Sequence, residues 1–341
     1  MPNQYDTSTM LEVVNTLDTF EPFLLNMFFP EMVNFATSKI EFDVIDEDMQ
    51  LAPFVSPMVA GKADKANGGE LRSFKPAYVK PKNVVDPERV IKRKAGEPIG
   101  GGTMSPDQKR NAIITDLLLE HQKKIMRRKE WMAAQALLTG KVTVEGEDYP
   151  KVEVDFKRDA GNAITLAGAL TWDKANLATA TPLEDVDAWG VLCEGPITKL
   201  VFDRLSWADF IRFQEVKDLM DTRRGSQSQL ELGPDNGERD YSYKGMLGAD
   251  IECWVYSGYY KDETGVKQNY MPDNTVIAGS AAVQGVRAHG AILDGEAGYQ
   301  ALDFFPKNWV QKDPAVEYVM SQSAPLMIPK RPNAIVTVTT K

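Results

Sequence analysis

Apolar residues recur every three to four positions along residues 105–139, a spacing typical of an amphipathic helix. Both ends of this stretch carry helix signals. Ser105 and Gln108 form an S-x-x-Q capping box, Pro106 suits the first helical position, and Gly140 follows a run without internal Pro or Gly. At about 1.5 Å per residue such a helix spans roughly 50 Å, more than the width of a small compact domain. We therefore predict one long spine helix.

One side of the predicted spine is apolar, and Lys123 and Arg127 fall on the opposite side. His121 lies within the apolar side, where a packed and hydrogen-bonded histidine is expected rather than a metal ligand or a base. The apolar side comprises Ile114, Leu117, Leu118, His121, Ile125, Met132 and Ala136.

Alternation of apolar and polar residues predicts strands elsewhere in the chain. After the spine, "KVTVEGEDYPKVEVDFKR" is typical of a half-buried hairpin, with Val152, Val154 and Phe156 on one face. The stretches "KLVF" (199–202) and "ADIECWVYSGYY" (249–260) predict further strands, as does the proline-interrupted C-terminal end. A buried helix is expected near Leu205–Leu219. Together these elements predict an α+β fold.

Two segments resemble extensions from this body. Residues 1–37 form an arm whose apolar cluster, "FEPFLLNMFFP", is bounded by prolines that limit any helix to about two turns. Such an arm must cover either its own core or a neighbouring chain. Residues 50–100 are charged and rich in proline, with the turn signal Asn67, Gly68 and Gly69. We expect a projecting hairpin, because this segment has too few large apolar residues for a core of its own.

The charge distribution changes this picture further. The net charge of −10 argues against general DNA binding, which needs a surplus of cations at the contact surface. Residues 62–97, however, hold ten Lys or Arg against five Asp or Glu. A basic segment on an acidic body is suited to pairing copies of one chain. The alternative is a solvated basic loop without a partner.

No catalytic, cofactor or metal site stands out. Cys193 and Cys253 fit small core residues, and the two histidines lack ligand spacing. The acidic stretch "EFDVIDEDMQ" lacks the glycine of a calcium loop. "GEPIGGGT" lacks the Gly-Lys-Ser/Thr of a phosphate loop, so Gly100, Gly101 and Gly102 are expected to form a hinge beside the spine. A catalytic carboxylate pair stays open among 49 acidic residues.

The chain has no apolar stretch long enough to span a membrane and begins without a signal sequence. A projecting arm, a projecting hairpin and a long spine without a site therefore predict a subunit that works by assembling with copies of itself.

Specific strings carry a resemblance to the lambda-type phage major capsid proteins, the phage capsid protein E family. In the second half they are "FDRLSWADFIRFQEVKDLMDTRRGSQSQLE", "SYKGMLGADIECWVYSGYY", "YMPDNTVIAGS" and "FPKNWVQKDPAVEYVMSQSAPLM". In the first half "APFVSPMVAGK" and "FKPAYVKPKNVVDPERVIKR" resemble the extended-loop region of that family. The order is collinear over nearly the whole length.

The resemblance implies the Hong Kong 97-like phage capsid fold. Residues 1–37 would be the N-terminal arm and residues 50–100 the extended loop over a neighbouring subunit. Residues 38–49, 101–165 and 305–341 would form the peripheral domain with its spine helix 105–139, and residues 166–304 the axial domain.

The resemblance also implies a function and partners. Copies would form pentamers and hexamers of an icosahedral shell around double-stranded DNA, without sequence-specific binding and without a membrane. Scaffolding protein, portal and a decoration protein would be separate partners. Assembly in the host bacterial cytoplasm, and a place in the virion, follow. The alternatives are an encapsulin-like compartment and a soluble enzyme with an unrecognised carboxylate site.

The stretch "LMDTRRGSQSQLEL" admits an anion site, but its resemblance to the family at "DTRRGS" favours contact between subunits. Arg223 and Arg224 are therefore expected to bind an acidic neighbour. The extended loop supplies the other expected intersubunit contacts, which are Lys92, Arg93, Lys94, Asn67, Gly68 and Gly69.

Overall fold

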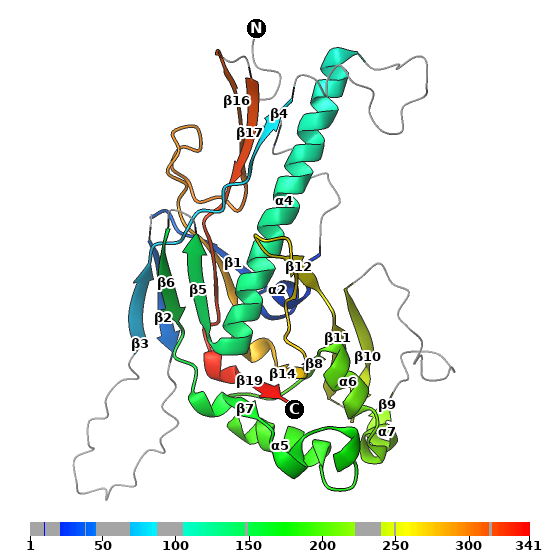
Figure 1. Cartoon of the computed structure of the whole chain (residues 1–341). Coiled ribbons are helices and arrows are strands. Elements are labelled where there is room, and N and C mark those ends of the chain that lie inside the picture. The colour runs from blue at the N-terminus through cyan, green and yellow to red at the C-terminus, as the bar shows by residue number, and fades with distance from the viewer. Residues whose placement is uncertain are drawn as a thin grey trace, which may run out of the picture.

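The structure is a computed structural model, and Figure 1 shows an elongated molecule with one long helix running from one end to its centre. The described residues are 10, 21–37, 39–45, 69–86, 105–146, 149–221, 240–248, 250–313 and 316–341. Side chains are described for these residues except 42–45, 69–72 and 221.

The long helix is α4, Pro106–Thr139, and its ends follow the predicted signals. The Ser105 backbone N–H donates to Gln108 Oε1 at 2.8 Å, and the Gln108 N–H donates to Ser105 Oγ at 3.3 Å. Gly140 has a left-handed φ of 68°, and its N–H donates to the Ala136 carbonyl. The predicted spine helix is confirmed because each of its end signals is local in sequence.

A seven-stranded mixed sheet forms the other end of the molecule. In spatial order its strands are β7 (Ala163–Thr165), β19 (Ile335–Thr339), β14 (Thr275–Gly279), β8 (Lys199–Phe202), β11 (Ile251–Tyr256), β10 (Tyr241–Leu247) and β9 (Met220–Asp221). Strand β8 runs parallel to β11 and antiparallel to β14. The predicted strands "KLVF" and 251–256 are therefore confirmed as neighbours in one sheet.

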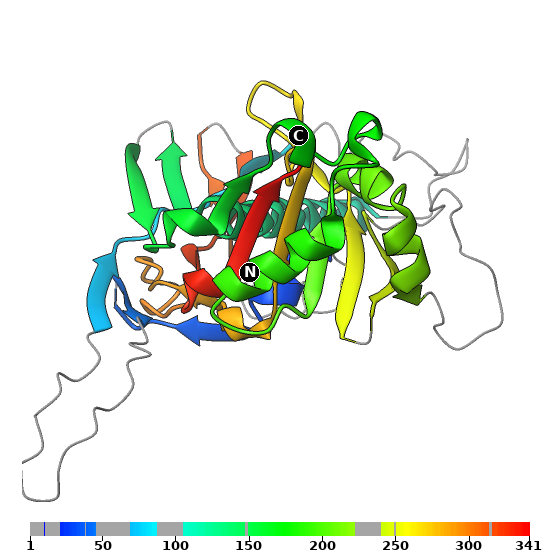
Figure 2. The same ribbon diagram turned by 90° about the horizontal axis from the view of Figure 1, so that it is seen from below.

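Both faces of this sheet are buried. Leu200 and Phe202 pack on one side with Trp172, Trp189 and other aromatic residues, whereas Val201 points to the core around α4. Figure 2 shows the green helix α5 (Pro182–Leu192) crossing the near face of the sheet, with α4 behind it. A strand buried on both faces explains why "KLVF" is apolar almost throughout.

The predicted single helix near Leu205–Leu219 is wrong, because two short helices occupy this stretch. They are α6 (Arg204–Phe210) and α7 (Gln214–Leu219). Phe213 has an extended ψ of 132° at the break. The bend brings Phe210, Phe213 and Val216 into the same core, which one straight helix would not do.

Smaller sheets surround α4. A three-stranded sheet of β16 (Phe305–Gln311), β17 (Val316–Gln322) and β4 (Lys82–Val85) packs along its first half, and a second contains β1 (Glu31–Asn34), β15 (Val286–His289) and β18 (Pro325–Ile328). Three two-stranded sheets complete the fold. They are β2 (Ile40–Ile45) with β3 (Gly69–Phe74), β5 (Lys141–Gly146) with β6 (Tyr149–Asp155), and β12 (Tyr259–Lys261) with β13 (Lys267–Asn269).

The small sheets contain several of the segments that the sequence predicts to be strands or loops. The β5–β6 hairpin and the proline-interrupted C-terminal strands are confirmed. Gly69 is the first residue of β3. This strand lies within the predicted extended loop and pairs with residues 40–45 of β2, which precede that loop. Strand β4 lies within the predicted extended loop and pairs with β17.

The apolar arm cluster covers the chain's own core rather than a neighbour. Helix α2 (Phe23–Phe28) buries Phe23, Leu24, Leu25 and Phe28, and the following Phe29 is also buried. These side chains join the core that contains the second half of α4. In Figure 1 the blue α2 accordingly lies beside α4, close to the middle of the molecule.

Candidate functional site

Most residues predicted to contact a neighbouring subunit lie outside the described residues. These are Arg223, Arg224, Lys92, Arg93, Lys94, Asn67 and Gly68, and the predicted hinge Gly100, Gly101 and Gly102 lies outside them as well. Gly69, in β3, is the exception. The described residues show instead how the spine is joined to the rest of the molecule and which side chains its surfaces present.

Glu130 joins the arm to the spine. Its carboxylate accepts hydrogen bonds from the backbone N–H groups of Leu24 and Leu25 at 2.8 and 2.9 Å and from the Tyr256 hydroxyl at 2.8 Å. Burial raises the pKa of Glu130, while these three donors favour its charged form. One buried carboxylate therefore links the start of α2, the middle of α4 and strand β11.

Arg287 on β15 holds the other end of α2. Its guanidinium donates to the carbonyl of Phe29 at 2.7 Å, to the carbonyl of Leu25 at 3.2 Å and to Asn26 Oδ1 at 2.8 Å. Carbonyls at a helix C-terminus lack intrahelical donors, so a cation is stabilising there. The arm residues 23–29 are thus fixed at both ends.

A second buried group on the spine is Lys129, which contacts the carboxylate of Asp303. His289 Nε2 lies 3.0 Å from the same Asp303 oxygen. Burial, with a smaller effect from Arg287, lowers the pKa of Lys129 to about 7, and burial lowers the pKa of His289 to about 3. His289 is therefore neutral at pH 7, and its contact with Asp303 is a polar contact rather than an ion pair.

His121 is packed and hydrogen-bonded, as predicted. Its ring nitrogens lie 3.0 Å from Ser321 Oγ on β17 and 3.0 Å from Asn83 Oδ1 on β4. Burial, followed by the nearby charge of Lys124, lowers its pKa to about 4. The neutral imidazole therefore joins the spine to two strands of the β16–β17–β4 sheet.

Toward the start of the spine, the guanidinium of Arg110 donates to both oxygens of Glu317 on β17, at 2.6 and 2.7 Å. Asn308 on β16 donates to the same carboxylate at 2.7 Å. Bidentate pairs of this kind fix geometry more strongly than single contacts do. The first half of α4 is therefore fastened to the sheet at Glu317 and again at His121.

The outer face of this sheet, the side turned away from α4, presents aromatic residues. Trp309 and Tyr318 are paired across β16 and β17 and stack with ring centroids 5.4 Å apart. Lys82 Nζ lies 4.1 Å from the centroid of the Tyr318 ring. Val84 continues the row on β4 and is 46% exposed. We call Trp309, Tyr318 and Val84 the sheet outer row.

Other exposed apolar side chains occur around α5. Val191 is 86% exposed, and Leu170, Leu177 and Leu192 are also exposed. Several exposed apolar side chains in one segment make it a candidate for contact with other chains. The sheet outer row and the α5 region are therefore the described surfaces best suited to contact other chains.

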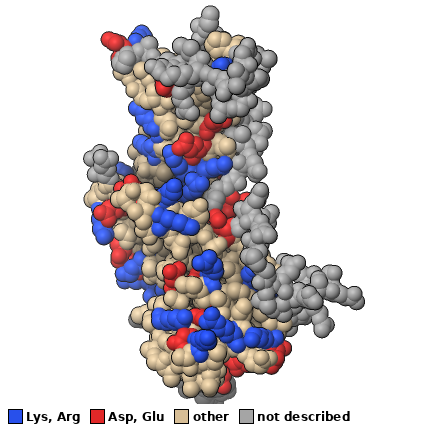
Figure 3. All heavy atoms as spheres, turned by 45° about the vertical axis from the view of Figure 1, so that its right-hand side comes forward, with Lys and Arg blue, Asp and Glu red and all other residues tan. Residues whose placement is uncertain are grey.

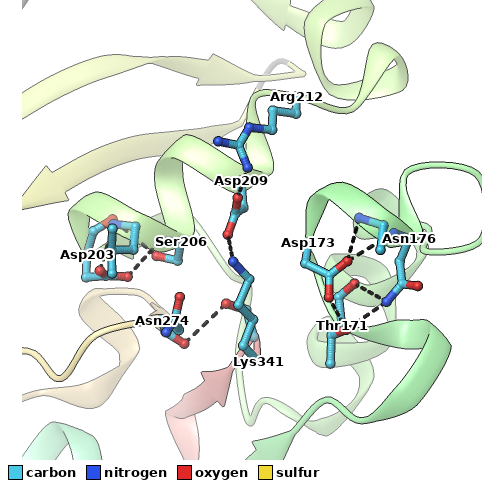
Figure 4. A network of polar contacts seen from close by, with 12 residues as sticks. Thr171, Asp173, Asn176, Asp203, Ser206, Asp209, Arg212, Asn274 and Lys341 are labelled. Atoms are coloured by element: carbon cyan, nitrogen blue, oxygen red, sulfur yellow. Dashed lines mark hydrogen bonds and ion pairs between the residues drawn. The ribbon is translucent and has the colours of Figure 1, made fainter.

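The end of the sheet near the C-terminus is held by a network of polar contacts (Figure 4). Buried Asp209 contacts Arg212 and the side chain of Lys341. Asp203 caps α6 by accepting from the N–H groups of Leu205 and Ser206 at 2.8 and 2.9 Å. These contacts order the sheet end, and their carboxylates are occupied by internal partners.

The described residues contain no cluster of three or more His, Cys, Asp or Glu side chains that could hold a metal ion. No helix among them is long and apolar enough to cross a membrane. Burial raises the pKa of Cys193 to about 11 and that of Cys253 to about 12, so both thiols are protonated at neutral pH.

The amino-acid sequence is similar to those of known phage capsid proteins over almost its whole length. The family model of the phage major capsid protein E matches residues 6–340. The major capsid protein of Escherichia phage N15 is 40% identical over 338 residues, with 98% of each chain covered. That of Escherichia phage lambda is 38% identical over 340 residues, covering 98% of this chain and 99% of the relative.

A solved structure shows the same fold. The crystal structure of a protein described as a prophage capsid protein of Escherichia coli CFT073 is 31% identical, covers 99% of both chains and has a TM-score of 0.78. The predicted α+β, Hong Kong 97-like capsid fold is thereby confirmed. The matches favour the phage capsid prediction over an encapsulin-like compartment or a soluble enzyme. The chain belongs to the phage major capsid protein E family.

Proposed function

We propose that copies of this major capsid protein form the pentamers and hexamers of an icosahedral shell that encloses double-stranded DNA and expands as the DNA is packaged. The observation that carries this proposal is the match to capsid proteins along residues 6–340. Because the matched relatives are covered end to end, the proposal concerns the whole chain rather than one shared module.

Exposed Val84 and Val191, with the half-buried Trp309 and Tyr318, support assembly by lateral contact. The sheet outer row lies on the β16–β17–β4 sheet, whereas the α5 region lies on the helical segment that covers the seven-stranded sheet (Figure 2), so the two can contact different neighbours. A shell needs many modest contacts per subunit, because misplaced subunits must dissociate before closure while the sum holds the finished shell. Separate surfaces on one chain satisfy this requirement.

The domain organisation proposed for the family fits this role. Residues 38–49, 101–165 and 305–341 would form the peripheral domain along the spine, and residues 166–304 the axial domain at capsomer centres. Strands β7 and β19 belong to the same sheet as β8, β11 and β14, so the two domains would share that sheet at their boundary. Leu24 and Leu25 of the arm are hydrogen-bonded to Glu130 of the spine.

Three further elements of the proposal concern segments that, except for Gly69, lie beyond the described residues. Lys92, Arg93 and Lys94, with the turn Asn67, Gly68 and Gly69, would bring the extended loop onto an acidic neighbour. Gly100, Gly101 and Gly102 would let the loop change its angle to the spine during expansion. Arg223 and Arg224 would form ion pairs between subunits.

The partners proposed are scaffolding protein during assembly, a portal at one vertex and a decoration protein on the finished shell. Assembly would take place in the bacterial cytoplasm, and the product is part of the virion. The acidic total charge suits a container that must release its DNA, because dense phosphate contacts would retain it.

A charge-removal experiment tests assembly through residues 223 and 224. The double variant Arg223→Ala with Arg224→Ala is expected to give few shells in sedimentation while retaining the far-ultraviolet circular dichroism of the folded chain. Arg204→Ala, an exposed arginine on α6, is the control and should assemble normally. Normal shells from the double variant would remove these arginines from the proposed contacts.

A further inference from the structure

Two paired strands carry the chain into the predicted extended loop. Strands β2 and β3 pair from Ile40 with Phe74, where they meet the body, to Ile45 with Gly69. Ile40 is fully buried, and Phe74 packs against the same core. Residues 46–68 join the other ends of these two strands, which we call the loop ribbon. The direction of the loop ribbon therefore sets where the chain leaves the body.

The base of the loop ribbon is fixed next to the end of β15. Pro76, close after the ribbon, is buried and packs so closely on Gly290 that a Cβ there would lie 2.8 Å from Pro76 Cγ. The Ala291 N–H donates to the carbonyl of Thr37, just before β2, at 3.1 Å. Proline also restricts the preceding Lys75 to extended conformations, so the direction of the Lys75 carbonyl is fixed.

The tip of the β5–β6 hairpin contacts this base. The Tyr149 hydroxyl donates to the Lys75 carbonyl at 2.9 Å. The Tyr149 ring packs against the same core as Phe74 does. Figure 1 shows β5 and β6 beside β2 and β3, and Figure 2 shows both pairs of strands at the same edge of the molecule. A hairpin that starts directly after α4 thus touches the loop ribbon.

The local sequence explains how Tyr149 reaches the ribbon base. Val144 pairs with Val152 and Gly146 with Tyr149, so two steps along β5 oppose three along β6. Pro150 lies within this bulge, a position that suits a residue without a backbone N–H. Because bulges re-aim the side chains beside them, the irregular pairing here directs the one residue that contacts Lys75.

The other end of the β5–β6 hairpin is joined to the spine. Strand β5 begins at Lys141, directly after the Gly140 that ends α4. Val142 and Val154 are buried in the core that contains the second half of α4, and the Phe156 N–H donates to the Gly140 carbonyl at 3.0 Å. The hairpin therefore lies between the spine and the loop ribbon and contacts both.

The direction of the extended loop matters because charge alone selects no single target. Residues 62–97 hold ten Lys or Arg against five Asp or Glu. Figure 3 shows Asp and Glu side chains among Lys and Arg side chains over one face of the body, so a neighbouring copy presents acidic groups at several places. Long-range attraction brings charged surfaces together, whereas their orientation decides which contacts form.

We propose that Tyr149 is a positioning residue for assembly, which holds the loop ribbon at a fixed angle to the spine so that the extended loop reaches a neighbouring subunit in one orientation. This inference rests on the proposed function. A subunit whose ribbon takes many orientations presents the competent one only part of the time, and its apparent affinity for a neighbour falls by that fraction. Because a capsomer would need such a loop from each subunit, the loss is repeated at every contact.

Spin labels on the unassembled chain test the positioning directly. Ser73→Cys, at an exposed site on β3, and Lys174→Cys, at an exposed site on the body, carry the labels after Cys193 and Cys253 are replaced by Ala. Pulsed electron–electron double resonance should give one narrow distance distribution when Tyr149 is present. The variant Tyr149→Ala should broaden this distribution markedly, because the ribbon base loses both the ring and the hydrogen bond.

Tyr260→Ala is the matched control. Tyr260 is likewise a partly buried aromatic residue packed against the main core, but it lies on β12. Its removal should lower the melting temperature to a similar extent and leave the distance distribution narrow, which separates loss of packing from loss of positioning. Tyr149→Phe keeps the ring and should broaden the distribution less than Tyr149→Ala does.

Light scattering during shell assembly tests the consequence. Tyr149→Ala should form shells several-fold more slowly than the original chain, and Tyr260→Ala at nearly the original rate. A narrow distance distribution or an unchanged rate for Tyr149→Ala would overturn the inference. If that variant failed to fold, Tyr149→Phe with the distances and rate of the original chain would overturn it as well. If the original chain formed no shells, the proposed function would fail, whereas the spin-label comparison would still decide whether Tyr149 positions the ribbon.

Discussion

The carboxylate of Glu130 accepts a 2.8 Å hydrogen bond from the backbone N–H of Leu24, 106 positions earlier in the chain. The N–H groups at the start of a helix have no intrahelical acceptor, and Glu130 supplies one for α2 from within α4. Glu130 therefore joins the arm helix α2 to the spine through one buried carboxyl group.

Replacing Glu130 by Gln tests the anchor. The amide keeps the volume but offers one acceptor in place of two, so at least one donor from Leu24, Leu25 or Tyr256 loses its partner. We expect the free energy of unfolding to fall by about 1–3 kcal/mol, measured by denaturant titration of the unassembled chain. Glu145→Gln, at an exposed position on β5, should change it by less than about 0.5 kcal/mol. Equal stability of the two variants would show that the anchor contributes nothing.

His121 predicts a loss of stability in acid. Its pKa is lowered from 6.5 to about 4 in the folded chain, so between these values the unfolded chain binds more protons. The contribution of the neutral His121 ring to the free energy of unfolding is complete above pH 6.5. As the pH falls from 6.5 to about 4, this contribution declines by about 1.4 kcal/mol for each pH unit.

The variant His121→Gln tests this effect. It should show a smaller difference in unfolding free energy between pH 7 and pH 5 than the original chain, because it lacks the titrating ring. His289 is unchanged in both proteins and contributes equally to the two pH profiles. Identical pH profiles would exclude His121 as a source of acid sensitivity.

Gly140 and Gly168 form a matched pair for testing the end of the spine. Both have left-handed φ values, 68° and 62°, so a substitution by Ala strains the backbone by about 1–2 kcal/mol at either site. A Cβ at Gly140 would lie 2.6 Å from Arg158 Cβ, whereas nothing lies within 4 Å at Gly168. Arg158 holds the carbonyls of Leu137 and Leu138, so moving it also releases the helix end.

We therefore expect Gly140→Ala to lower the melting temperature more than Gly168→Ala does. Differential scanning calorimetry of the two variants gives the comparison directly. An equal decrease would mean that backbone strain alone, and not the contact with Arg158, accounts for the glycine at position 140.

Trp309 tests the sheet outer row as an assembly surface. Trp309→Ala removes the ring that stacks on Tyr318, while the buried side of the sheet keeps its contacts with α4. We expect shells to form poorly and soluble chain to accumulate in sedimentation, with Trp309→Phe restoring much of the assembly because it keeps an aromatic contact. Normal shell yield from Trp309→Ala would remove this row from the assembly surfaces.

The sequence predicted those features whose signals are local. The capping box at Ser105 and the left-handed Gly140 specify the ends of α4 within a few residues, and the alternation in 149–155 specifies a strand. The break at Phe213 was missed because both halves of the stretch have helical periodicity. Only the shared core shows why the chain bends there.

The anchors of the spine were missed for a different reason. Lys129 and Glu130 are adjacent charged residues just before the apolar run "WMAAQALL", and their partners are 174 and 106 positions away. Two charged residues beside an apolar run indicate that the charges are buried. This local pattern does not indicate which distant residues they contact. Contacts between subunits lie further out of reach, because one chain contains only half of each interface.

The central claim is that this chain assembles into closed shells. Electron microscopy of the purified protein, supported by light scattering, measures this most directly. We predict uniform icosahedral particles of megadalton mass built from the 37.9 kDa chain, when it is expressed with its scaffolding protein. Small oligomers that form no shells under those conditions would contradict the account.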